Sequence, residues 1–198
     1  MSAIAHERGP AATASPDGYP RTIDNGAGER LTFLRRVPDP AGDRLEVENL
    51  VAPGSGPPMH VHHHQEEALT VQEGRIAYQR PGEPPRFAGV GATVSFAPGE
   101  PHRFWNPGQD DLRVSGYLRP ADNAEFLLTA LYRSQRERGG GRPGMLDVAF
   151  LSTRYRSEMG ILDGPAAVRR LALPLLAVAG RLLGRYRRYA DAPEPIRR

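Results

Sequence analysis

The sequence predicts a mainly β domain, a sandwich or small barrel of short strands, followed by about three α-helices. Glycine and proline are abundant, with 22 Gly and 20 Pro in 198 residues, which favours short strands joined by turns. Strand-like runs recur between turn signals up to Pro120, and apolar residues recur at helical spacing after it. Short strands at close, regular spacing are typical of a sandwich or barrel rather than of βαβ units.

Short runs with strand character follow one another before Pro120. They read "ERLTFLRRV", "DRLEVENLV", "EALTVQ", "RIAYQRPG", "PRFAGVG", "ATVSFAP", "HRFWN" and "LRVSGYLRP". We therefore expect a barrel domain over residues 29–120. Residues 1–28 are rich in Ala, Gly, Pro and Ser with few large apolar side chains, so we expect them to form a flexible N-terminal arm.

A helical extension is expected over residues 121–190, followed by a flexible tail at 191–198. Asp122 is a suitable N-cap, with Glu125 three residues later, for a first helix through "NAEFLLTALYRSQRER". A second helix is expected over "MLDVAFLSTRYRSEMG". A third begins after Gly164 and runs through "AAVRRLALPLLAVAGRLLGRYRR", where Pro174 is predicted to kink it.

The third helical segment, "RRLALPLLAVAGRLLGRYRR", has Arg at both ends and an apolar centre. That centre is about 14 residues long, too short to cross a bilayer core of about 30 Å. Packing on the barrel, a contact in a homodimer, and contact with a membrane surface are the three alternatives. Because the centre is apolar almost all round, packing or a homodimer contact is favoured over surface binding.

Composition excludes several kinds of chemistry. The chain has no Cys, so disulfides, thiolate metal sites and a cysteine nucleophile are excluded. All 26 basic residues are Arg, which excludes a Schiff base on a lysine. The sequence contains no apolar run typical of a signal peptide or a membrane span, and a cytoplasmic location is expected.

Charge is concentrated in the last third of the chain. Residues 133–198 hold 14 Arg and 6 acidic residues, a net charge of +8, whereas residues 1–132 carry −5. This third could meet an anionic surface or pair with the acidic first part. Nucleic-acid binding is not expected, because no recognition helix or zinc finger accompanies the Arg residues.

The stretch "GSGPPMHVHHHQEEALTVQEG", residues 54–74, holds four His within five positions, followed by two Glu. Its spacing is G-x5-H-x-H-x4-E-x6-G, and "GATVSFAPGEPHRFWN" downstream adds G-x2-H-x3-N. The two motifs resemble those of the cupin superfamily, whose fold is a small antiparallel β-barrel of jelly-roll type. The resemblance covers about residues 43–120 and departs at Ala97, where the family often has Pro.

The resemblance implies a metal site and a set of turns. It gives His60, His62, Glu67 and His102 as the metal ligands. Asn106 is implied to be structural. The motif glycines are implied to lie at turns: Gly54, Gly74, Gly91 and Gly99.

Strand geometry supports the same cluster. Residues two apart face one side of a strand, so His60 and His62 can point together into a barrel. Glu67 has the opposite parity, so "HHQE" must turn the chain before the next strand. Three imidazole nitrogens and one carboxylate suit one divalent Fe, Mn, Ni, Co, Cu or Zn ion and leave two octahedral positions open. Mg and Ca prefer oxygen ligands.

A His-rich surface loop would explain "HVHHHQ" alone, but not the second motif with its own His. His63, His64 and Glu66 are expected to be non-ligands. His64 shares the parity of the ligands but lies where the chain must turn, and His64 or Glu66 could instead support the site as a neighbour or proton shuttle.

The function predicted from these patterns is that of a metal-dependent cupin acting on a small organic molecule, with a quercetinase-like dioxygenase favoured. Glu67 is the candidate catalytic base, and no organic cofactor is expected. Redox-neutral isomerase, cyclase or lyase chemistry on the same site is the first alternative. A non-catalytic binding or sensing module, stabilised by its metal, is the second.

Overall fold

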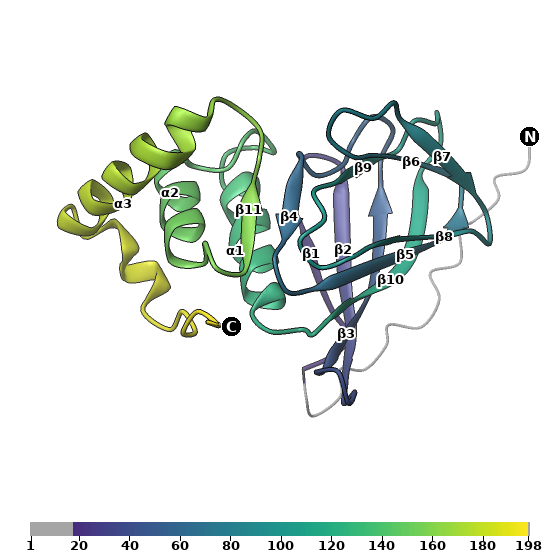
Figure 1. Ribbon diagram of the computed structural model, residues 1–198, viewed down its shortest axis with the longest axis horizontal. Helices are drawn as coiled ribbons and strands as arrows, with labels where there is room; N and C mark the ends of the chain where they lie inside the picture. Colours follow the sequence, from purple (N-terminus) through teal and green to yellow (C-terminus); the bar gives the residue numbers. More distant parts are fainter. Residues whose placement is uncertain (1–17, 198) are drawn as a thin grey trace, which may run out of the picture.

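The computed structural model describes residues 18–197, in which an antiparallel β-barrel lies beside a group of helices (Figure 1). The larger sheet has six strands in the order β1-β2-β3-β10-β5-β8. Their bounds are Arg21–Asp24 (β1), Glu29–Val37 (β2), Arg44–Val51 (β3), Leu112–Arg119 (β10), Glu66–Glu73 (β5) and Thr93–Phe96 (β8). The predicted mainly β fold with C-terminal helices is confirmed.

Two smaller sheets complete the β structure. One has the order β7-β6-β9, and the other pairs β4 with β11. Their bounds are Arg86–Gly89 (β7), Arg75–Gln79 (β6), Arg103–Trp105 (β9), His60–His62 (β4) and Met159–Ile161 (β11). Because β11 comes from the helical extension, that extension adds a strand to the edge of the barrel (Figure 1).

The barrel core is built from side chains that alternate along the strands. In β3 every second residue is buried, so one face of the strand points inward. The cluster at one end of the barrel consists of Val51, Leu69, Val71, Ile76, Val94, Phe96, Phe104, Leu112 and Val114. A second cluster continues from the barrel onto α1 and includes Leu31, Phe33, Leu45, Val47, Leu118, Ala124 and Tyr132. The extension therefore shares a core with the barrel.

Three α-helices follow the barrel, as predicted: α1 (Ala124–Arg136), α2 (Met145–Arg154) and α3 (Leu173–Leu182). The expected N-cap of the first helix is wrong by one residue: Asn123 is the cap, and Asp122 precedes it with a φ of 40°. The second helix is shorter than expected, because the segment after Arg154 turns and pairs with β4 as β11.

The third helical segment is disturbed beside Pro174, where a kink was expected. A π-helical turn, Val168–Ala172, precedes α3, and a 3-10 turn, Arg185–Tyr189, follows it. Proline has no N–H for the carbonyl four residues earlier and its ring crowds that carbonyl, so a wider turn before Pro174 relieves the contact.

Both expected flexible ends need correction. Residues 1–17 of the N-terminal arm lie outside the described residues, but Arg21–Asp24 forms β1 and pairs with β2. Tail residues 191–197 lie against the end of α2, the turn that follows it and the N-cap of α1. The Glu194 carbonyl accepts from Asn123 Nδ2, and the Ile196 carbonyl accepts from Ser157 Oγ. Backbone pairing at one end and side-chain hydrogen bonds at the other hold both segments.

Helix α3 packs on α2 (Figure 1). An apolar stripe along α3 and the turn before it remains exposed to solvent. The stripe consists of Leu171, Leu175, Val178 and Leu182, which are 67%, 71%, 59% and 83% exposed. The expected packing of this segment on the barrel is therefore wrong for that face. That a second copy covers the stripe stays a prediction. Within residues 18–197 no helix combines the length and apolar character needed to cross a membrane.

Candidate metal centre and its pocket

Four side chains from three parts of the barrel meet at one point. His60 and His62 come from β4, and Glu67 comes from β5 after the turn at residues 63–65. His102 precedes β9 and is joined to His60 by two backbone hydrogen bonds of 2.9 Å. As expected from the sequence, His60 and His62 face the same side of their strand, and the turn after them lets Glu67 face the two imidazoles.

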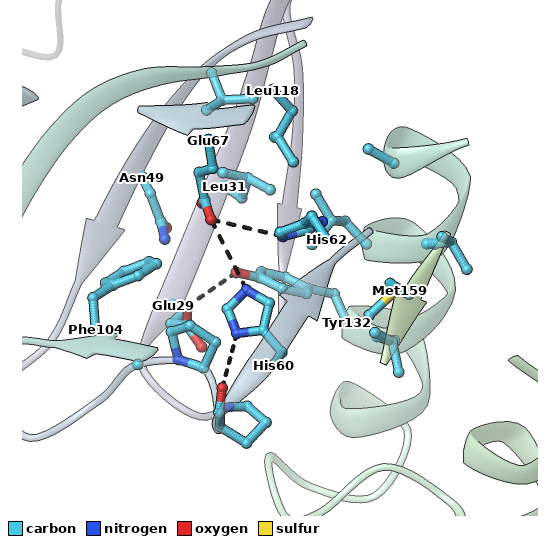
Figure 2. Close-up of a pocket in the computed structure, with 18 of the residues that line it drawn as sticks. Glu29, Leu31, Asn49, His60, His62, Glu67, Phe104, Leu118, Tyr132 and Met159 are labelled. Carbon is cyan, nitrogen blue, oxygen red and sulfur yellow. Dashed lines mark hydrogen bonds and ion pairs between the residues drawn. The ribbon is translucent and has the colours of Figure 1, made fainter. Parts of the chain in front are cut away.

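The four groups converge closely enough to share one ion. Their potential ligand atoms all lie within 4.8 Å of one another, and all four residues are buried. The Oε2 atom of Glu67 lies 3.9 Å from His60 Nε2, 3.6 Å from His62 Nε2 and 2.8 Å from His102 Nε2. In Figure 2 the dashed lines from Glu67 run to the labelled His60 and His62 rings.

The other nitrogen of each ring is already engaged. Nδ1 of His60 donates to the Pro58 carbonyl at 2.9 Å, and Nδ1 of His102 donates to the Glu100 carbonyl at 2.9 Å. Nδ1 of His62 lies 3.1 Å from Oε1 of Gln65, which accepts its proton. These acceptors fix each neutral ring so that the Nε2 lone pair faces the cluster, as in protein metal sites. In that tautomer His102 Nε2 and the Glu67 carboxylate are both acceptors, so a cation between them, either a proton or a metal ion, stabilises their 2.8 Å approach.

The protonation states favour metal binding. Burial, with the neighbouring imidazoles, lowers the pKa of His60 to about 3, and burial also lowers the pKa of His62. Burial tends to raise the pKa of Glu67, but a proton held between it and His102, together with the positive charge of the imidazoles when they are protonated, outweighs burial and brings the pKa to about 2. Neutral imidazoles with an ionised carboxylate are the forms that bind a divalent metal. The donor set therefore fits a first-row transition metal.

Packing behind the cluster holds His102 in place. Its ring stacks on Phe96 with ring centroids 3.8 Å apart and an interplanar angle of 3°. Phe96 is fully buried in the barrel core. Because both rings are enclosed, the His102 imidazole has one orientation available to it.

The residues expected not to be ligands lie outside the cluster. His63 is exposed and His64 is half-buried in the turn between β4 and β5. Glu66 points to the other face of β5, where it binds Arg119 at 2.6 Å and accepts from the Tyr117 hydroxyl.

Asn106 is structural, as the resemblance implied. Its Nδ2 donates to the carbonyls of Val51 and Asp110, and its Oδ1 accepts from the Gly108 amide. The motif glycines adopt positive φ at turns: Gly54, Gly74, Gly91 and Gly99.

His60, His62 and Glu67 of the cluster line an apolar cavity of about 170 Å³. Barrel residues form one side, including Leu31, Val47, Leu69, Phe104 and Leu118. The helical extension forms the other side, through Ala124, Leu127, Leu128, Leu131, Tyr132, Met159 and Ile161. Figure 2 shows the labelled Tyr132 and Met159 beside the helix and strand that close this side. The extension is therefore part of the site and not an appendage to it.

Sequence reasoning missed several polar residues of the pocket, among them Gln65, Glu29, Asn49 and Tyr132. Gln65 was treated only as a turn residue, although its position between His62 and Glu67 was a usable signal. Glu29 and Tyr132 line the same cavity but lie far from the motifs in sequence. A charged residue on the inward face of a strand is a weak signal that could have drawn attention to Glu29.

Comparison with known proteins agrees with this geometry. The family described as "Cupin domain" matches residues 48–117, a segment that contains all four clustered side chains. Residues 48–117 therefore belong to the cupin superfamily. The C-terminal helices lie outside the matched segment. No curated protein matches the chain.

Solved structures with a similar fold include proteins of different activities. Polyketide cyclase RemF from Streptomyces resistomycificus is 24% identical over 50% of this chain and 73% of that chain, with a TM-score of 0.43. A Cupin 2 conserved barrel domain protein from Salinispora arenicola is 23% identical over 60% of this chain and 92% of that chain, with a TM-score of 0.43. DMSP lyase DddQ from Ruegeria pomeroyi is 24% identical over 38% of each chain, with a TM-score of 0.35.

Proposed function

We propose that this protein is a metal-dependent enzyme that acts on a small organic molecule. The observation that carries the proposal is that three residues of the four-residue cluster, His60, His62 and Glu67, line an apolar cavity, with His102 directly behind them. A metal that served only to stabilise the barrel would need no such space beside it. A cavity with few polar groups next to a metal site is the usual setting for a bound substrate.

The cluster would hold one divalent Fe, Mn, Ni, Co, Cu or Zn ion through three Nε2 atoms and the Glu67 carboxylate. When bound, such a metal supplies Lewis-acid polarisation of a substrate oxygen and, if it is redox-active, a site for dioxygen chemistry. The apolar walls exclude water and orient the substrate against the cluster.

Glu67 is proposed to act mainly as a ligand. Its pKa of about 2 makes it a permanent anion but a weak base while His102 and the other imidazoles surround it. The proposed role as catalytic base therefore requires the carboxylate to move away from His102 Nε2 first. Glu67→Gln separates the two roles: loss of metal indicates a ligand, whereas retained metal with lost turnover indicates a base.

Cavity size limits the substrate. An apolar cavity of about 150 Å³ holds one benzene molecule, so the volume of about 170 Å³ here suits a molecule of about one ring or a short chain. Oxygenase action is therefore proposed on small phenols or diketones rather than on multi-ring flavonoids.

Redox-neutral isomerase, cyclase or lyase chemistry is the second candidate. One observation favours it: the pocket also holds Glu29 and Tyr132, two groups that can carry protons, joined by a hydrogen bond of 3.2 Å. Isomerase, cyclase and lyase reactions move protons to and from carbon and oxygen atoms of the substrate, and the protein supplies the acid and base groups for these transfers.

Elemental analysis of the purified, untagged chain tests the proposal, followed by oxygen uptake and product analysis with small phenols and diketones. About one transition metal per chain with substrate-dependent oxygen uptake supports the oxygenase. Metal with product formation but no uptake supports the redox-neutral enzyme. Metal without any turnover supports a binding or sensing module, and a chain that retains no metal contradicts the proposal.

A further inference from the structure

A second polar group of residues lines the same cavity, apart from the proposed metal ligands. Glu29 on β2, Asn49 on β3 and Tyr132 on α1 all face the pocket (Figure 2). The neighbouring inward positions on the two strands are apolar, including Leu31, Phe33, Val47 and Val51. Three polar side chains grouped among these apolar neighbours mark a place where a polar group of a ligand can be bound.

Strand register brings Glu29 and Asn49 together. Glu29 pairs with Val51 and Leu31 pairs with Asn49, so Glu29 and Asn49 are diagonal neighbours on one face of the sheet. Tyr132 approaches from the helical extension, and its hydroxyl donates to Glu29 Oε2 at 3.2 Å. The group is therefore assembled from both parts of the chain.

The Glu29 carboxyl is fixed from both sides. Nδ2 of Asn25 donates to Glu29 Oε1 at 3.0 Å, while Tyr132 occupies Oε2. Asn25 is itself held by its own loop, because its Oδ1 accepts from the amides of Ala27 and Glu29. Asn25 thus has a structural role, and Glu29 has little freedom to turn away from the pocket.

Asn49 differs, because one of its polar atoms has no partner. The side chain is 4% exposed, and its Oδ1 atom makes no hydrogen bond with any described residue. A buried acceptor without a partner is unfavourable, and such atoms are rare in folded proteins. Asn49 lines the cavity, so a small rotation of its side chain can present this buried oxygen to a donor on a bound ligand.

We propose that Asn49, supported by Glu29 and Tyr132, is the second anchoring point for the substrate. It would accept a hydrogen bond from a hydroxyl or amino group of an otherwise apolar ligand of about one ring. Another oxygen of the same ligand would face the metal cluster. This inference rests on the proposed function, since it assumes a small molecule bound beside the metal. It deepens that function by naming the chemical class: small cyclic molecules with oxygen on one side and a hydrogen-bond donor on another.

Binding of matched probes tests the anchoring point. The full chain is loaded with Co²⁺, and benzoate, 3-hydroxybenzoate and 4-hydroxybenzoate are titrated by calorimetry and by the visible cobalt spectrum. The probes share a carboxylate for the metal and differ only in the hydroxyl group. We expect at least one hydroxybenzoate to bind about tenfold more tightly than benzoate, as one additional hydrogen bond to a buried acceptor predicts.

Asn49→Leu removes the acceptor at similar volume, and Asn49→Ala is the second variant if the first folds poorly. Either variant should lose the preference for the hydroxylated probe while it keeps its affinity for benzoate. Gln72→Leu, which removes an amide from an exposed position on β5, is the matched control and should keep the preference. Circular dichroism of each variant confirms the fold.

The outcomes separate this inference from the proposed function. Co²⁺ binding with equal affinity for all probes, or a preference that survives in both Asn49 variants, overturns the anchoring point and leaves the metal site intact. Absence of stoichiometric Co²⁺ binding overturns the proposed function and the anchoring point with it. Bound Co²⁺ with no affinity for any probe shows that the cavity does not take a ligand of this class, which also overturns the inference.

Discussion

The side chain of Gln65 connects His62 to the start of the helical extension. Its Oε1 accepts from His62 Nδ1 at 3.1 Å, and its Nε2 donates to the carbonyl of Ala121 at 3.0 Å. Gln65 is 3% exposed, and Ala121 directly follows the barrel and precedes α1. The orientation of a proposed metal ligand therefore depends on the point where the two parts of the chain join.

Gln65→Leu should lower metal affinity by about 10-fold to 100-fold, the usual effect of losing a partner that orients a ligating imidazole. Without the Gln65 acceptor, the His62 ring can rotate or take its other tautomer. Competition with a chelating indicator of known affinity measures the change. Gln72→Leu, at an exposed position on β5, serves as the control, and equal affinity in the two variants would show that Gln65 does not orient His62.

His62→Ala and His64→Ala separate a proposed ligand from its neighbour. His62 is buried with Nε2 3.6 Å from Glu67, whereas His64 is half-buried in the turn outside the cluster. We expect His62→Ala to abolish stoichiometric binding of a divalent metal and His64→Ala to retain it. The metal content of each variant after gel filtration measures this difference. A similar loss of metal in both variants would be incompatible with the assignment of His62 as a ligand.

The barrel and the four clustered side chains could be predicted because their signals are local. Strand parity places His60 and His62 together, and two short motifs bring Glu67 and His102 to the same pair of histidines. The helical extension was harder to place. β11 was expected to be helix, but its formation depends on pairing with β4, a partner about 100 residues earlier in the chain.

The rest of the pocket depends on contacts distant in sequence. Tyr132 has the spacing of an ordinary helix residue, and only the packing of α1 on the barrel brings its hydroxyl to Glu29, 103 residues away. Similarly, Asn49 occupies an inward position whose importance appears only when its oxygen is found without a partner. Periodicity gives the face of a residue but not the element that packs against that face.

The apolar stripe on α3 should hold two copies of the chain together. Leu175 and Leu182 lie near its centre and one end and are 71% and 83% exposed. Leu175→Glu combined with Leu182→Glu should convert a dimer to a monomer in light scattering, because a charge cannot be buried at an apolar contact without a large cost. Val90→Glu, at an exposed position on the barrel, should leave the mass unchanged. A wild-type chain that is monomeric at all concentrations would contradict the dimer.

Glu29 should make the stability of the metal-free protein depend on pH. Burial raises the pKa of its carboxyl above the ordinary value of 4.5, although hydrogen bonds from Tyr132, Asn49 and Asn25 act in the opposite direction. The negative charge of Glu67 raises the pKa further. The unfolded chain therefore ionises at a lower pH than the folded chain, and folding stability falls as the pH rises from 4.5 toward the folded pKa.

Glu29→Gln removes this ionisation and keeps an acceptor for the neighbouring donors. The stability of the variant relative to the wild type should therefore increase with pH above 4.5, by up to about 1.4 kcal/mol per pH unit until the folded pKa is reached. Denaturant unfolding of both metal-free proteins between pH 4 and 8 gives this difference, in which the titration of the shared histidines cancels. A difference that stays constant across the range would mean that Glu29 ionises as easily in the folded protein as in the unfolded chain.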